Sequence, residues 1–213
     1  MESIRWPVIG VDESGKGDFF GPLVIAGVLI EEEQAGIVTQ WGVRDSKTVT
    51  DKKVLALAQQ IQGLCVWDVV VINPEKYNQL YGRIRNLNKL LGWGHARVIE
   101  NLLTRKPAET AISDKFGDDR FIINSLQKQG KQVRLIQQVR AESHPAVAAA
   151  SIIARAEFLR RMQGLEKQYN TAFPLGASAA VDEAGRALVK ARGAAILDQV
   201  AKTHFKNYKK IVC

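Results

Sequence analysis

Two adjacent acidic residues, Asp12 and Glu13, stand at the end of an apolar stretch near the start of the chain. A lysine flanked by two glycines follows at once, in Gly15-Lys16-Gly17. Carboxylates at the edge of a core need a positive partner, because burying an unpaired charge is costly. Glycines let a backbone approach a ligand closely, and backbone amides beside a lysine suit a phosphate. The stretch therefore predicts a cation site next to an anion site.

A third acidic residue, Asp114, follows the β-rich stretch from Ala108 to Ser113. If this stretch and the one before Asp12 are neighbouring parallel strands, their carboxyl ends share the sheet edge where open α/β folds bind ligands. A regular strand would send Glu13 to the opposite face, so it joins the other acids only if the chain leaves strand geometry. Each acid alone has an ordinary interpretation as a surface or capping residue. Together, as oxygen ligands with few histidines nearby, they favour Mg²⁺ or Mn²⁺.

The composition indicates a basic protein with a polyanionic partner. Among 213 residues, 30 Lys and Arg outnumber 22 Asp and Glu, which gives a formal charge of +8. Such an excess is typical of nucleic-acid binding, although it also favours solubility alone. We expect no membrane segment and no secretory signal. The isolated Cys65 and Cys213 suit neither a disulfide framework nor a zinc site, so we expect a cytoplasmic location.

The elements that must position these residues alternate between strands and helices. Strands are expected over residues 6–12, 22–30, 64–72, 108–113 and 131–138. Helices are expected from the Thr50 cap to Gln62, from Pro74, over 86–103, from Asp118 or Asp119 to Gly130, and after Pro145. This order predicts an α/β fold, and an antiparallel hairpin of the first two strands makes the sheet mixed. The segment 169–185 would divide a body of about residues 1–170 from a helical appendage of about 171–213.

Four stretches, taken in chain order, resemble the motifs of type 2 ribonucleases H. They are GVDESGKGDFFGPLVIAGV, RDSKTVTDKK, AVAAASIIARAEFL and HFKNYKKI, and they span nearly the whole chain. The details resemble ribonuclease HIII more than ribonuclease HII, since Gly-Lys-Gly replaces Gly-Arg-Gly and RAEFLRR replaces a segment with VTRD. The resemblance implies one catalytic domain over residues 1–213, with an RNase H-like fold: a mixed central sheet flanked by helices, with a C-terminal helical appendage.

The resemblance also implies the activity. A ribonuclease H hydrolyses the RNA strand of RNA–DNA hybrids with two Mg²⁺ or Mn²⁺ ions and leaves 5′-phosphate and 3′-hydroxyl ends. Asp12, Glu13 and Asp114 match three of the four acids of the family site. For the fourth acid the sequence favours Glu157 by its helix position, with Glu142 and Asp118 as the alternatives.

The substrate contacts follow from the same motifs. The backbone of Ser14, Gly15, Lys16 and Gly17 would sense the 2′-hydroxyl that distinguishes RNA from DNA, with a phosphate contact from Lys16. Further candidates are Ser46 and Lys47 in the Asp-Ser-Lys loop, Ser151 as a packing residue or a nucleic-acid contact, and Lys206 in a basic tail with Lys202, Lys209 and Lys210. His204 and Phe205 would anchor that tail. His95 is interpreted as a hydrogen-bonded structural residue, and Trp93 as core.

One departure from the family pattern concerns the start of the chain. Ribonuclease HIII typically carries an N-terminal substrate-binding domain, whereas here the catalytic motif begins at once, so we expect a short form that binds through its body and tail. Two other functions stay open: a ribonuclease HII-like junction enzyme acting on single ribonucleotides in a DNA duplex, and a non-catalytic hybrid-binding module. We expect a monomer.

Overall fold

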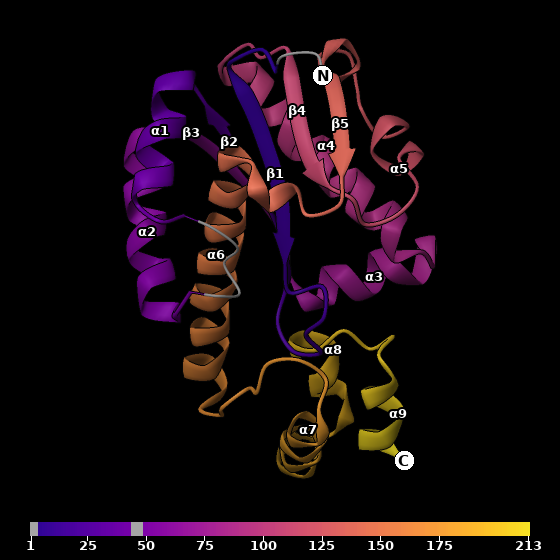
Figure 1. Cartoon of the computed structure of the whole chain (residues 1–213). Coiled ribbons are helices and arrows are strands. Elements are labelled where there is room, and N and C mark those ends of the chain that lie inside the picture. Colours follow the sequence, from indigo (N-terminus) through magenta and orange to yellow (C-terminus); the bar gives the residue numbers. More distant parts are fainter. Residues whose placement is uncertain (1–3, 44–48) are drawn as a thin grey trace. The chain divides into compact units, whose positions relative to one another are not determined.

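A computed structural model describes residues 4–43 and 49–213 (Figure 1). The chain forms two compact units, each built from separate stretches of sequence. The first unit comprises Met1–Glu13, Ile25–Val70 and Asn86–Ala156. The second comprises Ser14–Val24, Val71–Arg85 and Glu157–Cys213.

A five-stranded sheet is the framework of the first unit. The strands are β1 (Val8–Ser14), β2 (Leu23–Ile30), β3 (Val66–Ile72), β4 (Thr110–Asp114) and β5 (Arg134–Gln138), and their order is β3-β2-β1-β4-β5. β1 pairs in parallel with β4, and β4 with β5. β1 and β2 are neighbours joined by a turn too short for a parallel crossover, so they run antiparallel. The sheet is therefore mixed, as predicted.

Helices cover both faces of this sheet (Figure 1). The first unit contains α1 (Glu32–Gln40), α2 (Asp51–Leu64), α4 (Leu87–Arg105), α5 (Arg120–Ile123) and the first half of α6 (Pro145–Tyr169). Gly10 lets α6 approach β1, because a Cβ there would lie 2.1 Å from the carbonyl carbon of Ala146. Gly27 does the same for α4, since its Cβ would lie 2.3 Å from Val98. The two helices pack on opposite faces of the sheet.

The second unit is mainly helical. It contains α3 (Pro74–Ile84), the second half of α6, α7 (Ala179–Arg192), α8 (Leu197–Val200) and α9 (Lys206–Val212). α7 and α9 pack closely, because a Cβ at Gly185 would lie 2.4 Å from Ile211. The side-chain amide of Asn78 on α3 donates to the Ala201 carbonyl at 2.9 Å, which ties α3 to the end of α8.

Most of the predicted elements are confirmed, and one helix is wrong. Thr50 caps α2 and Pro74 begins α3. The helix expected to run to Gly130 ends at Ile123, because the Glu100 carboxylate accepts the amides of Gln127 (2.6 Å) and Gly130 (2.9 Å) and so holds that chain in a turn. The structure also contains α1, which the patterning did not predict; its start is stabilised by a capping box between residues 31 and 34.

Within the described residues, no helix has both the length and the apolar character needed to cross a bilayer.

Candidate active site

Asp12 and Asp114 lie at the carboxyl ends of neighbouring parallel strands, as predicted. The register pairs Val11 of β1 with Ser113 of β4, so the next position places Asp12 beside Asp114. Residues paired in this way project from the same face of a sheet. Asp114 is held in place at its Oδ1 atom, which accepts the Ala141 amide at 3.2 Å.

Asp12 is an acid in an unfavourable environment. Its pKa is raised from 3.8 to about 7. Burial is the largest cause of this rise, and the neighbouring charges of Glu13 and Asp114 also contribute to it. The Glu13 amide donates to Asp12 Oδ1 at 2.7 Å, and a hydrogen bond from Ser151 on α6 also favours the ionised form. The two hydrogen bonds do not offset the burial. A bound cation would, because it stabilises the carboxylate directly.

Glu13 follows regular strand geometry and points away from Asp12's face, toward α4. Its Oε2 atom lies 3.1 Å from Nε2 of His95, which is fully buried. The other ring nitrogen lies 3.0 Å from Ser113 Oγ, which donates to the Asp114 carbonyl at 3.0 Å. His95 links the acid of β1 to the end of β4, so the prediction that it is hydrogen-bonded is confirmed.

The donor chemistry of this edge suits a divalent cation, but the side chains do not form a ready-made cage. Asp12, Glu13 and Asp114 offer only carboxylate oxygens, the ligands that Mg²⁺ and Mn²⁺ prefer. In the part of the chain that the structure describes, no three or more His, Cys, Asp or Glu residues form a group placed to hold a metal ion. The hydrogen bond between Glu13 and His95 accounts for this, since it holds one of the three acids on the other face.

The turn after β1 belongs to the second unit and depends on its glycines. Gly15 has φ 88°, in the left-handed region, and a Cβ there would lie 2.2 Å from the Pro22 carbonyl oxygen. Gly17 is exposed and has open space around it, and Lys16 is half-buried. At Gly17, therefore, the tip of the turn presents backbone with open space beside it.

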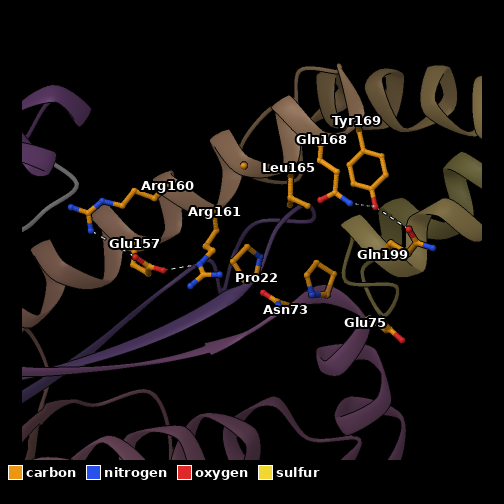
Figure 2. Close-up of a pocket in the computed structure, with 12 residues that line it drawn as sticks. Pro22, Asn73, Glu75, Glu157, Arg160, Arg161, Leu165, Gln168, Tyr169 and Gln199 are labelled. Carbon is orange, nitrogen blue, oxygen red and sulfur yellow. Dashed lines mark hydrogen bonds and ion pairs between the residues drawn. The ribbon is translucent and has the colours of Figure 1, made fainter.

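Glu157, the predicted fourth acid, lies on α6 in the second unit with two arginine partners. Its carboxylate pairs with Arg161 at 2.7 Å and with Arg160 at 3.7 Å. Figure 2 shows these three residues along one wall of a pocket of about 690 Å³, whose opposite side includes Pro22 and Gln199.

The two alternative acids have other surroundings. Asp118 is exposed, and its bidentate contact with Arg120 lowers its pKa to about 2. Glu142 is half-buried in the short helical turn Ala141–Ser143 before α6.

The remaining substrate candidates fall in different environments. Ser46 and Lys47 lie outside the described residues. Ser151 is 6% exposed and hydrogen-bonds Asp12, which gives it a partner inside the protein. Lys206 is exposed at the start of α9.

The tail differs from the expectation at Lys202, which is fully buried and cannot lie along a duplex. Its Nζ donates to the carbonyls of Asp18 and Gly21. In the sequence it is one lysine among several, and the apolar residues Val200 and Ala201 just before it were the only signal. His204, stacked on Tyr81 with 4.1 Å between centroids, and Phe205 do anchor the segment, as predicted.

Comparisons with known proteins agree with the fold. Residues 9–208 match the family model described as Ribonuclease HII. Ribonuclease HIII of Chlamydia felis is 46% identical over 99% of this chain and 71% of its own length. A solved structure of Bst-RNase HIII in complex with Mn²⁺ has a TM-score of 0.89 at 34% identity, covering 96% of this chain and 68% of that one. Ribonuclease H2 from Pyrococcus horikoshii has a TM-score of 0.82 at 25% identity, covering 96% of both chains. The chain therefore belongs to the type 2 ribonuclease H family, in its ribonuclease HIII group, and is a nuclease.

Proposed function

We propose that this nuclease hydrolyses the RNA strand of RNA–DNA hybrids with two divalent ions, Mg²⁺ or Mn²⁺, and leaves 5′-phosphate and 3′-hydroxyl ends. The observation that carries the proposal is the pair Asp12 and Asp114 on adjacent parallel strands, with a pKa of about 7 at Asp12. A carboxyl group whose surroundings disfavour its ionised form to this extent indicates a cation-binding role. The relatives named ribonuclease HIII and the Mn²⁺-bound neighbour support the same conclusion.

Each acid has a proposed role. Glu13 and Asp114 would be ligands of one ion and Glu157 of the other, with Asp12 as a ligand of both. Bound ions would neutralise charge at the scissile phosphate and lower the pKa of a water so that it loses a proton to solvent and becomes a hydroxide nucleophile. The hydroxide oxygen would form a bond to phosphorus as the bond to the 3′-oxygen breaks, and the 3′-oxygen would take a proton from solvent and leave as a hydroxyl. Asp12 would release its proton when an ion binds, and Ser151 and the Glu13 amide would then orient its carboxylate.

The substrate contacts come from several segments. The backbone of Ser14, Gly15, Lys16 and Gly17 would read the 2′-hydroxyl, since the exposed Gly17 leaves this turn open to a strand. Ser46, Lys47 and Lys206 are proposed contacts to phosphates. Ser151 is a further proposed contact to the nucleic acid. The charge of +8 supports a polyanionic partner for a chain that we expect to act as a monomer in the cytoplasm.

Product mapping on defined substrates tests the proposal. We expect cleavage at several positions of a uniform RNA–DNA hybrid, in the presence of Mg²⁺ or Mn²⁺ and not of EDTA. Asp12→Asn or Asp114→Asn should abolish cleavage while hybrid binding persists, because each removes a metal ligand at little steric cost. Normal turnover in either variant would exclude the two-ion mechanism.

The same assay separates the junction activity. A ribonuclease HII-like enzyme would instead cut a DNA duplex that contains one ribonucleotide and leave the uniform hybrid largely intact. The structural similarity to ribonuclease H2 is the observation that keeps this second function in view.

A further inference from the structure

The turn at the end of β1 has two halves that differ in their backbone hydrogen bonds. The tip, Ser14 to Gly17, has one backbone hydrogen bond within the turn among the described contacts, from the Asp18 amide to the Gly15 carbonyl at 3.4 Å. The base, Asp18 to Gly21, is paired with a distant segment of the second unit. The Phe19 amide donates to the Gly176 carbonyl at 2.9 Å, and the Gly21 amide to the Val200 carbonyl at 2.8 Å.

Lys202 holds the carbonyl groups of this base. Its Nζ donates to the Asp18 carbonyl at 2.8 Å and to the Gly21 carbonyl at 2.7 Å, and its own amide donates to the Phe19 carbonyl at 2.8 Å. One residue therefore binds three of the four carbonyls in the base. An antiparallel bridge between Phe20 and Ala201 completes the pairing.

Making these contacts requires the lysine to be completely buried. Lys202 has no exposed surface, and desolvation lowers its pKa from 10.5 to about 7, although the Asp18 carboxylate opposes the shift. A buried cation is expensive, and an apolar side chain would fill the same space at lower cost. Without Nζ, however, the carbonyls of Asp18 and Gly21 would lose their donor. Both hydrogen bonds of Nζ go to the turn, and its other described contact is with the ring of Tyr77 on α3, at 5.8 Å from the centroid.

We propose that Lys202 is a positioning residue for substrate selection: it fixes the base of the turn so that the tip, Ser14 to Gly17, is held ready to read the 2′-hydroxyl of the RNA strand. This role rests on the proposed function, because Lys202 would support the turn that is proposed to recognise RNA. Holding a short recognition loop in its bound shape lowers the entropic cost of ordering it on binding. Loss of the Lys202 contacts should therefore weaken the preference for RNA more than the attraction to phosphates.

The test is the affinity ratio between an RNA–DNA hybrid and a DNA duplex of the same sequence, measured by fluorescence anisotropy in EDTA. In Lys202→Met, which keeps the apolar stem and removes the Nζ donors, we expect hybrid affinity to fall about tenfold, the equivalent of about 1.4 kcal/mol. Duplex affinity, which depends on phosphate contacts, should change less than about twofold. The matched control is Lys190→Met, the same substitution at an exposed lysine of α7 in the same unit, which should leave the ratio unchanged.

The outcomes separate the two proposals. A wild-type protein with no preference for the hybrid would contradict the proposed function itself. A clear wild-type preference that persists in a folded Lys202→Met protein would overturn the positioning role and leave Lys202 as a stabilising residue only. If circular dichroism shows that Lys202→Met does not fold, the ratio is measured in Lys202→Gln, whose shorter amide cannot reach both carbonyls. A preserved ratio there would overturn the role equally.

Discussion

At the scale of single residues, Asp12 is a carboxyl group whose surroundings disfavour its charged form. Desolvation and the nearby charges of Glu13 and Asp114 raise its pKa to about 7. Such an arrangement destabilises the protein without a cation and becomes favourable with one. Stability and function should therefore oppose each other at this position.

We expect Asp12→Asn to stabilise the metal-free protein while it abolishes cleavage. Above pH 7 the gain can reach about 4 kcal/mol, because the pKa rises from 3.8 to about 7 and each unit corresponds to about 1.4 kcal/mol. Urea unfolding in EDTA measures it. A variant less stable than the wild type at pH 8 would show that the environment of Asp12 is favourable after all.

The raised pKa of Asp12 also predicts how the free energy of unfolding depends on pH. The folded state binds a proton at Asp12 more tightly than the unfolded state does, so stability from this group is present below about pH 4 and is lost as pH rises toward 7. The difference in unfolding free energy between Asp12→Asn and wild type should accordingly grow between pH 4 and pH 7 and then stay level. Added Mn²⁺ should reduce the difference at pH 7, because it binds only the wild-type carboxylate well.

His95 gives a second prediction at this scale. It contacts Glu13 and Ser113 and lies beside the ring of Phe116, at 4.9 Å between centroids. Groups that orient metal ligands typically contribute about 10- to 100-fold to affinity or activity. We expect His95→Ala to lower kcat by about that factor and to raise the Mn²⁺ concentration needed for half-maximal rate. His95→Gln, which keeps one donor, should recover part of the loss; equal losses in both variants would reduce His95 to a packing residue.

The sequence allowed some of these residues to be predicted and not others. Asp12 and Asp114 could be found because each follows an apolar strand, and strand ends collect at one sheet edge. The contact between Glu13 and His95 could not, because it joins residues far apart in the chain across the sheet. Lys202 was assigned to the surface because burial of a lysine is rare, and nothing in the spacing reveals the carbonyls that hold it.

At the scale of elements, the distance between α6 and β1 controls the site. Gly10 lets the helix approach the strand, and Ser151 on that helix then reaches Asp12. The small alanine side chains at the start of α6 also permit such close packing. The ends of α5 were not predictable, because the Glu100 carboxylate of α4 stops the chain in a turn that local propensity does not require.

We expect Gly10→Ala to destabilise the protein by about 1–3 kcal/mol or more, because the new methyl group would meet the backbone of Ala146 and neither side can yield. The matched control is Gly36→Ala in α1, where no atom lies within 4 Å. That substitution should be neutral or stabilise by up to about 1 kcal/mol, since alanine favours a helix. Thermal unfolding of both variants decides; equal melting temperatures would mean that α6 can move away from β1 at no cost.

At the scale of the whole molecule, the charge of +8 has to be assigned to particular surfaces. Lys202 is buried and Lys210 pairs with Asp182 at 3.4 Å, so of the four lysines expected in the tail Lys206 and Lys209 remain exposed without a described ion pair. Deleting the tail would not test them cleanly. α9 buries Asn207 and Ile211, and its loss would disturb the second unit as well as its charge.

Charge reversal of Lys206 and Lys209 is the sharper experiment. If both lysines contact phosphates, the double variant to Glu should bind hybrid more weakly and show a salt dependence shallower by about two counterions. The matched control reverses Lys128 and Lys131, two exposed lysines of the first unit, and so changes the net charge equally. Affinity measured at several salt concentrations compares the two slopes. If both variants lose the same affinity and slope, long-range charge alone accounts for binding. If the tail variant keeps the wild-type slope, the phosphate contacts lie elsewhere, with Lys16 and the arginines of α6 as the next residues to test.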